Sequence, residues 1–174
     1  MVADATRTVG RRLGHVDNSA FRHAMRSLAS GVAIVAAGRG EARVGATVSS
    51  LASLSLTPPT LMISLSRASS TLAGIREIGA FSANVLAARH EFLADRFGGR
   101  SGLQGAKRFD DARWTHGATG APILIDALAS FDCTVEEIIE RHSHAIVLGS
   151  VVATAEGPDE AALVHWRGAF GTSG

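Results

Sequence analysis

Short hydrophobic runs, separated by glycine, proline or brief helical patterns, constrain the fold of this chain more than any other feature. Runs of this length, rich in β-branched residues and ended by turn residues, are typical of β-strands. The expected strands are 32–37, 44–50, 61–65, 81–86, 128–139, 144–155 and 162–166. The stretch 38–41 forms a plausible hairpin turn, and Pro58-Pro59 ends one extended segment. We expect antiparallel pairing of roughly seven or eight strands into a barrel or strongly coiled sheet.

Helical patterns accompany these strands. Ser19 is the expected N-cap of a first helix in which Phe21, Met25 and Leu28 share one face and which Gly31 ends. We expect this helix to cover one end of the barrel. Two shorter helices are expected at 69–78 and 90–97. The fold class is therefore mainly β with flanking helices.

The domain organisation follows from length and patterning. A chain of 174 residues, 46% of them hydrophobic, is long enough for one buried core and too short to assume two. Residues 1–18 lack periodicity and are expected to be a flexible N-terminal extension, with 19–174 as a single domain. The glycine-rich and charged stretch 98–120 is expected to be a surface loop beside a binding site.

Charge and cysteine content narrow the function classes. With 19% charged residues and a formal net charge of +1, nothing draws the chain to nucleic acid or to a membrane surface. Arg11-Arg12 lacks the apolar core that an export signal needs, and no uncharged apolar run is long enough to span a bilayer. The single cysteine, Cys133, sits between Phe131 and Val135 in an apolar strand and is expected to be a buried structural thiol. A cytoplasmic protein is expected.

A serine-rich segment, 45–56, is the first candidate site. Small hydroxyl side chains leave the backbone accessible, so such a wall suits a flat heteroaromatic ring with donors and acceptors on its edge. Composition alone gives equal weight to a serine-rich edge strand followed by a turn.

A second polar cluster lies at the start of the helix expected at 69–78. Ser69, Ser70 and Thr71 stand near its N-terminus and Arg67 is close by, so a phosphate is the expected ligand. Ordinary N-capping explains only one of these hydroxyls. The stretch 38–43 fails the dinucleotide fingerprint at its last glycine. His142 and His144 share a strand face but lack a third ligand, so no metal site is expected.

Six segments stand in order along the chain: GVAIV at 31–35, GATVSS at 45–50, SLSLTPP at 53–59, FSANVL at 81–86, KRF at 107–109 and FDCTV at 131–135. Together they resemble the flavin reductase family that serves two-component monooxygenases and adopts the FMN-binding split β-barrel, a Greek-key-like fold. Three further segments, RFGG at 96–99, ARW at 112–114 and TGAP at 119–122, are most similar to the FMN reductase of oxidative pyrimidine degradation.

The resemblance implies two sets of binding residues. Those expected to hold the flavin are Arg43, Val44, Gly45, Ala46, Thr47, Ser49, Ser50, Ser64, Leu65, Ser66, Ser70, Thr71, Arg96 and Phe97. Those expected on the nicotinamide side are His144, Trp166, Arg167 and Gly168. The first set includes both polar clusters that local chemistry had already indicated.

Two positions depart from the family pattern. Relatives commonly show Gly-Asp-His where this chain has His142-Ser143-His144, which changes the turn before the histidine. Relatives often carry a tyrosine near the C-terminal Arg-Gly, whereas this chain has Phe170, which keeps the ring and lacks the phenolic hydrogen bond.

The resemblance implies hydride transfer from NADH, or NADPH, to FMN, or FAD, in a homodimer that supplies reduced flavin to a partner monooxygenase. No residue is expected to act as a catalytic acid or base. Three alternatives stay open: a flavin-binding protein without reductase activity, a pyridoxamine-phosphate-oxidase-like enzyme for which no basic phosphate cluster is found, and a nucleic-acid or structural adaptor.

Overall fold

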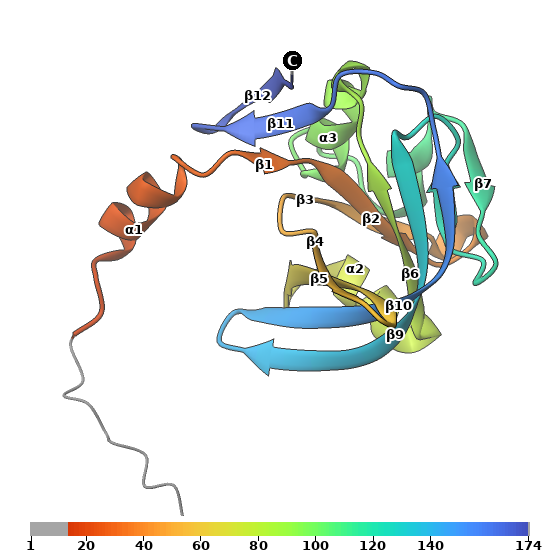
Figure 1. Cartoon of the computed structure of the whole chain (residues 1–174), viewed down its shortest axis with the longest axis horizontal. Helices are drawn as coiled ribbons and strands as arrows, with labels where there is room; N and C mark the ends of the chain where they lie inside the picture. Colours follow the sequence, from red (N-terminus) through yellow and green to blue (C-terminus); the bar gives the residue numbers. More distant parts are fainter. Residues whose placement is uncertain (1–13, 174) are drawn as a thin grey trace, which may run out of the picture.

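Seven antiparallel strands form the central sheet, which curls round a buried core and carries helices on its flanks (Figure 1). The computed structural model describes residues 14–173. The α-helices are α1 (Asn18–Met25), α2 (Ser70–Ile78) and α3 (Glu91–Phe97), and the short 3-10 helices are η1 (Gly40–Ala42), η2 (Ala88–His90) and η3 (Gly105–Phe109). The strands are β1 (Ser30–Gly31), β2 (Ala33–Ala37), β3 (Val44–Val48), β4 (Ala52–Leu56), β5 (Pro59–Ser66), β6 (Ala80–Val85), β7 (Trp114–His116), β8 (Pro122–Leu124), β9 (Ala129–Arg141), β10 (His144–Glu156), β11 (Leu163–Trp166) and β12 (Ala169–Thr172).

The order of the strands explains the curvature of the sheet. The order is β3-β2-β6-β9-β10-β5-β4, so the two edge strands, β3 and β4, are consecutive in sequence. Only residues 49–51 join them, and a link of that length spans at most about 14 Å. The sheet must therefore curl until its two edges approach each other. The β9–β10 hairpin lies between β5 and β6, a Greek-key-like arrangement, and the predicted mainly β fold with flanking helices is confirmed.

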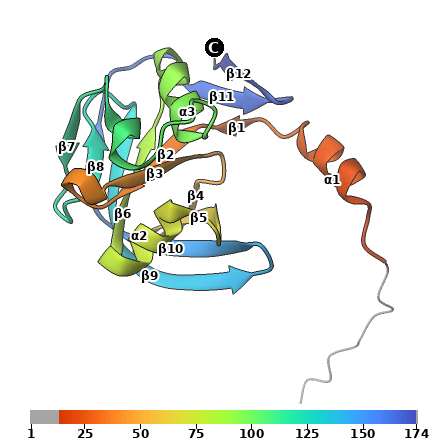
Figure 2. The same cartoon turned by 180° about the vertical axis from the view of Figure 1, so that it is seen from behind.

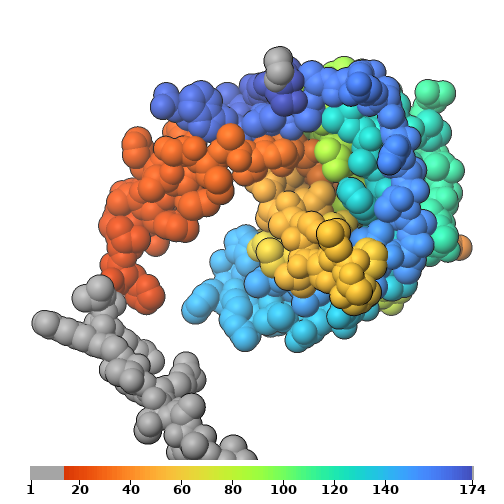
Figure 3. Space-filling view, in the orientation of Figure 1, coloured from red at the N-terminus to blue at the C-terminus, as the bar shows by residue number. Residues whose placement is uncertain are grey.

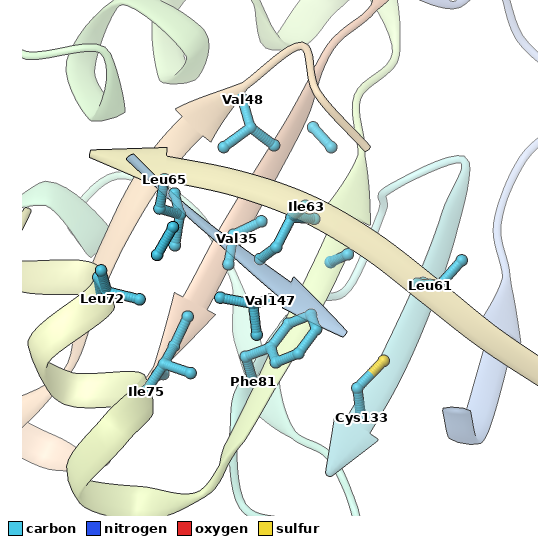
Figure 4. Close-up of a cluster of buried hydrophobic side chains, with 14 residues drawn as sticks. Val35, Val48, Leu61, Ile63, Leu65, Leu72, Ile75, Phe81, Cys133 and Val147 are labelled. Carbon is cyan, nitrogen blue, oxygen red and sulfur yellow. The ribbon is translucent and has the colours of Figure 1, made fainter. Parts of the chain in front are cut away.

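The core lies on both faces of β2, whose five residues are all buried. Val35 packs inside the curled sheet with Ile63, Phe81 and Val147, as Figure 4 shows. Ile34 points the opposite way and packs under α3. A strand buried on both faces needs a continuous hydrophobic run, and that is the pattern at 32–37.

Cys133 belongs to the core inside the sheet (Figure 4). The partly buried Phe131 and Val135 pack against the same core. Burial raises the pKa of its thiol to about 12. The prediction of a buried structural cysteine is confirmed.

A buried polar network explains why FSANVL interrupts a hydrophobic strand with Ser82 and Asn84. The Asn84 amide donates to the Ile34 carbonyl over 3.2 Å and accepts from the Leu124 backbone N–H over 2.9 Å. It also accepts from the Ser130 hydroxyl over 2.9 Å. One side chain thus fastens β2, β8 and β9 to β6, and a buried asparagine without these partners would be costly.

Most of the predicted elements are confirmed within a few residues, and two expectations are wrong. The stretch 98–120 is not only a surface loop, because it contains η3 and β7. Phe109 and Trp114 enter an aromatic cluster with Phe97, with ring centroids 4.9 and 5.8 Å from Phe97. Two aromatic residues thus anchor a stretch that is otherwise rich in glycine and charged residues.

Helix α1 does not cover the barrel. Its N-cap is Asp17 rather than Ser19, and none of its residues is buried. It stands off the sheet on an arm, as Figures 1 and 2 show from opposite sides. The helix ends at Met25, before Leu28, and Gly31 lies in β1, so the expected helix end is also wrong. Phe21 and Leu28 are 58% and 59% exposed, which leaves these apolar side chains largely uncovered.

Two small sheets were predicted only in part. Strand β11 pairs with both β1 and β12, and β7 pairs with β8. Their short length gives little periodicity to detect. No helix among residues 14–173 is long and apolar enough to cross a membrane.

Candidate functional site

A cleft of about 420 Å³ opens where the two edges of the sheet meet. Figure 3 shows this side of the molecule hollowed between the orange and yellow strands, the red N-terminal arm and the blue β9–β10 hairpin. The cleft is lined by Ala46, Thr47, Val48, Ser49, Ser50, Ser64, Leu65, Ser66, Ser69, Phe97, Gly98 and His144. Hydroxyl groups and backbone form its walls, and no lysine, arginine or carboxylate is among the lining residues.

Ser50 fastens the link between β3 and β4 to β5 at the base of this cleft. Its hydroxyl donates to the Ser64 carbonyl and accepts from the Ser64 N–H, both over 3.0 Å. A single side chain thus replaces a rung of strand pairing between the β3–β4 link and β5. Thr47 makes a similar link, because its hydroxyl donates to the Ala94 carbonyl of α3 over 2.7 Å.

Gly45 sets the depth of the cleft from behind. A Cβ at this position would lie 2.7 Å from a ring carbon of Phe97, which is closer than such contacts occur. Only glycine lets Phe97 pack against β3. The backbone carbonyl of Gly45 accepts from Arg108 over 3.1 Å, so the KRF segment secures the same strand.

A second compartment of about 190 Å³ adjoins the first. The two share Thr47, Val48, Ser49 and Gly98. The second compartment adds Val32, Ala94, Asp95, Arg100, His165 and Phe170. The shared residues make the two compartments neighbours, and the larger one has the size usual for small-molecule sites, on the order of 300–1,000 Å³.

Eight of the residues expected to hold a flavin line the cleft. These are Ala46, Thr47, Ser49, Ser50, Ser64, Leu65, Ser66 and Phe97. Six lie outside its lining: Arg43, Val44, Gly45, Ser70, Thr71 and Arg96.

The arginines expected near the flavin are engaged elsewhere. Arg43 stacks on Phe109 at 4.9 Å and lies 3.8 Å from Asp110. Arg96 donates to the Asp110 carbonyl and, over 3.1 Å, to the Asp111 carboxylate. Both guanidinium groups brace the 98–120 stretch against the sheet.

The expected phosphate position at α2 is built as a capped helix start. Ser69 is the N-cap, its hydroxyl accepts from the Thr71 N–H over 3.1 Å, and it lines the cleft. Thr71 is buried behind it. Arg67 does not face this position, because it pairs with Glu140 at 2.7 Å and donates to the His142 carbonyl over 3.2 Å.

His144 reaches the rim of the cleft from the start of β10. The departure at residues 142–144 preserves the tight hairpin, since Arg141 pairs with His144. His142 takes the positive φ of 50° that glycine would adopt more readily. The Ser143 hydroxyl lies 2.9 Å from His144 Nδ1. Among residues 14–173, no three histidine, cysteine or acidic side chains gather as metal ligands would.

The other three residues expected on the nicotinamide side lie away from His144. Arg167 and Gly168 form the β11–β12 turn with positive φ, and the Arg167 guanidinium stacks over Trp166 at 4.4 Å. This turn is tied to the N-terminal arm, because the Arg167 N–H donates to the Arg26 carbonyl over 3.0 Å. Trp166 and Arg167 line a separate groove of about 460 Å³ beside Ala29.

Sequence reasoning missed several lining residues. Val48 and Gly98 line the first compartment, and Asp95, Arg100 and His165 line the second. His165 alternates with Trp166 on β11, so it faces the second compartment while Trp166 faces the other groove. The position of β11 against α3 is a tertiary feature that no local pattern announces.

Comparison with known proteins places the chain in a family. A family model described as a flavin reductase like domain matches residues 25–174. The FMN reductase (NADH) RutF of Ancylobacter novellus is 34% identical over 163 residues, which cover 94% of this chain and 89% of that protein.

Solved structures agree with this match. The NADH:FAD oxidoreductase SgcE6 of Streptomyces globisporus is 26% identical with a TM-score of 0.82, over 94% of this chain and 99% of the other. The styrene monooxygenase flavin reductase of Pseudomonas putida is 27% identical with a TM-score of 0.78, over 88% and 97%. With the serine-lined cleft in place at the sheet edges, the chain belongs to the flavin reductase family.

Proposed function

We propose that the protein is an NADH-dependent FMN reductase. The observation that carries the proposal is the neutral, hydroxyl-lined cleft between β3 and β5 with His144 at its rim. A cleft with accessible backbone and small side chains admits a planar ring system and offers hydrogen bonds to its edge. The relative RutF is named an FMN reductase that uses NADH, which supports the choice of both nucleotides.

The residues that would bind the flavin divide by position. Ala46, Thr47 and Ser49 from β3 and its following link face Ser64 and Ser66 from β5 across the cleft. Ser69 and Ser70, at the start of α2, stand where the helix N-terminus favours the flavin phosphate. Thr71, Arg43, Val44, Gly45 and Arg96 would act from behind by fixing these elements. The expected flavin site thus consists of residues that would contact the flavin and residues that would support them.

The bound flavin and the nicotinamide supply the redox chemistry, with hydride passing between stacked rings. The protein holds the rings in place, excludes water and offers N–H and O–H donors where negative charge develops. His144 is the proposed nicotinamide-side contact in the cleft. No side chain need act as an acid or base. SgcE6 is named for FAD, so FAD is a second flavin substrate to test. NADPH is the second hydride donor to test.

A homodimer is the proposed working unit. Phe21, Met25 and Leu28 are apolar side chains that stay 46–59% exposed among residues 14–173, and the arm that carries them is tied to the Trp166–Gly168 turn. A partner copy of the chain would bury these side chains and bring its own turn residues toward a cleft. The proposal accounts for why Trp166, Arg167 and Gly168 lie outside the cleft of their own chain.

The proposed role in the cell is to supply reduced flavin to a monooxygenase. The similar protein of Pseudomonas putida is named as the flavin reductase of a styrene monooxygenase, which supports this role. Cytoplasmic residence is proposed because the single cysteine is a buried free thiol, as a reducing compartment permits. Residues 1–18, of which 1–13 lie outside the described residues, would then be an extension to a single catalytic domain at 19–174.

The test is steady-state oxidation of NADH and NADPH by purified protein in air, with FMN, FAD, riboflavin or no flavin added. We expect turnover that requires added flavin and is faster with FMN and NADH than with other pairs. FMN binding without oxidation of either nucleotide would contradict the proposal and identify a flavin-binding protein instead.

A further inference from the structure

We propose that the second compartment, lined by Asp95, Arg100, His165 and Phe170, binds the adenosine phosphate half of a dinucleotide. This inference rests on the proposed function, because FAD and NADH both carry that half. It assigns a role to three residues, Asp95, Arg100 and His165, that lie outside the nicotinamide and flavin sets described above.

The compartment differs in chemistry from the cleft that it adjoins. The first compartment is lined by hydroxyl and apolar residues with one histidine, whereas the second carries an arginine, a carboxylate, an imidazole and a phenyl ring. Thr47 and Ser49 belong to both. A ligand that spans the two must therefore have a neutral ring system at one end and a charged group with a second ring at the other.

The aromatic groups are arranged to receive a flat heterocycle. His165 and Phe170 are cross-strand partners on β11 and β12, with ring centroids 5.8 Å apart and planes inclined at 68°. The Arg100 guanidinium lies 5.5 Å from the centre of the Phe170 ring. Guanidinium and aromatic planes both stack on purine rings, and the arginine can move because 60% of its side chain is exposed.

The charged groups suit the sugar and phosphate. Arg100 donates to the Asp95 carboxylate over 2.7 Å, so one cation and one anion stand together at the mouth of the compartment. A guanidinium pairs with a phosphate oxygen, while a carboxylate accepts from ribose hydroxyls. A free phosphate would use the guanidinium and leave the Asp95 carboxylate without a donor of its own, whereas a ribose hydroxyl supplies that donor. The pair therefore fits an adenosine phosphate better than an inorganic anion.

The competing explanation is that Arg100 is only a latch that holds α3 against β12. A latch would contribute to thermal stability and leave nucleotide recognition unchanged. A binding role instead predicts a change in affinity that depends on which nucleotide is offered. Binding measurements with different nucleotides therefore distinguish a latch from a binding residue.

The first measurement is calorimetric titration of the flavin-free protein with AMP, adenosine and inorganic phosphate. We expect AMP to bind, adenosine to bind more weakly and phosphate alone not to compete. Arg100→Gln should weaken AMP binding by about tenfold, which corresponds to roughly 1.4 kcal/mol. The matched control is Arg76→Gln, which removes an arginine paired with Glu140 on the far side of α2 and should bind AMP as the wild type does.

Kinetics then identify the source of the adenosine. If the adenosine belongs to FAD, Arg100→Gln raises the KM for FAD about tenfold. The ratio of the KM values for FMN and NADH then stays as it is in the wild type. If it belongs to NADH, the KM for NADH rises with either flavin. His165→Ala should change the same KM values as Arg100→Gln does. It serves as the second variant if Arg100→Gln melts at a much lower temperature than the wild type.

The inference is overturned if wild-type protein binds no AMP, if inorganic phosphate competes as well as AMP, or if both variants bind AMP normally. Failure of the proposed function looks different. In that case no NADH is oxidised with any flavin, while AMP titration still reports on the compartment.

Discussion

At the scale of single residues, the cleft depends on what is absent from a side chain as much as on what is present. Gly45 has no Cβ because Phe97 occupies that space, and Ser50 is just long enough to bridge two backbone groups of Ser64. Neither residue is distinctive in a sequence, yet both decide where β3 lies against its neighbours. Substitutions here should affect binding through shape.

Gly45→Ala places a methyl group against the Phe97 ring and should lower the free energy of unfolding by about 1–3 kcal/mol through overpacking. Because Phe97 lines the cleft, the KM for FMN should rise as well. Gly31→Ala is the control, since a Cβ there meets nothing within 4 Å. Urea unfolding and flavin titration measure the two effects, and equal behaviour of both variants would contradict the account.

Ser50→Ala removes both hydrogen bonds to Ser64 and should cost about 1–3 kcal/mol of unfolding free energy, at a net of about 0.5–1.5 kcal/mol for each bond. Flavin affinity should fall with it, because the β3–β4 link is no longer held against β5. Ser53→Ala, at an exposed position on β4, provides the comparison. A Ser50 variant as stable as the Ser53 variant would show that the β3–β4 link needs no such bridge.

At the scale of elements, the predictable part of the fold is the part with strong local patterning. The strand β2 and the helix α2 were predicted almost to the residue, because a buried hydrophobic run and a serine N-cap with Gly79 as C-cap are local signals. The arm of α1 and the packing of Phe109 depend on contacts between distant segments. The serine-rich wall was predicted from its chemistry, whereas Arg100 and His165 came together only through the placement of β11 beside α3.

The start of α3 carries a pH-dependent contribution to stability. His90 is buried at the end of η2, where its Nδ1 accepts the Ala87 N–H over 3.2 Å. Burial lowers the pKa of His90, although Asp126, 3.5 Å from Nε2, opposes this shift. The unfolded chain therefore takes up a proton at His90 before the folded protein does.

The unfolding free energy should accordingly fall as the pH drops below about 6.5, the ordinary value for histidine. His90→Gln should flatten this decline between about pH 6.5 and 5, above the range in which carboxylates titrate. Denaturant unfolding at several pH values provides the measurement. His116→Gln, at an exposed position, is the control. If the unfolding free energy of the His90 variant falls with pH as steeply as that of the wild type, His90 is not the source of the decline.

At the scale of the whole molecule, the site lies where the curled sheet fails to close, and the N-terminal arm projects from the same side (Figure 3). The arm exposes apolar side chains and is tied to the β11–β12 turn, which lines the separate groove beside Ala29. Association of two chains through these side chains would link flavin binding to dimer formation. Dilution of the protein should then lower its activity per chain.

Phe21→Ser should weaken the dimer because it removes an apolar side chain that is 58% exposed in the single chain and would be buried between copies. Light scattering during size-exclusion chromatography measures the mass. Phe92→Ser changes a phenylalanine that is 49% exposed on α3 and should leave the mass unchanged. A wild-type protein that is monomeric at all concentrations and fully active would refute the proposed dimer.

The central claim is that the serine-lined cleft is where flavin receives hydride from NADH. The most direct measurement is anaerobic mixing of NADH and FMN with catalytic amounts of protein while the yellow flavin absorbance is followed. The wild type and Ser53→Trp should bleach FMN rapidly, whereas Ser49→Trp, which fills the space shared by the two compartments, should not. Equal bleaching by both tryptophan variants would contradict the account and place the reaction elsewhere on the molecule.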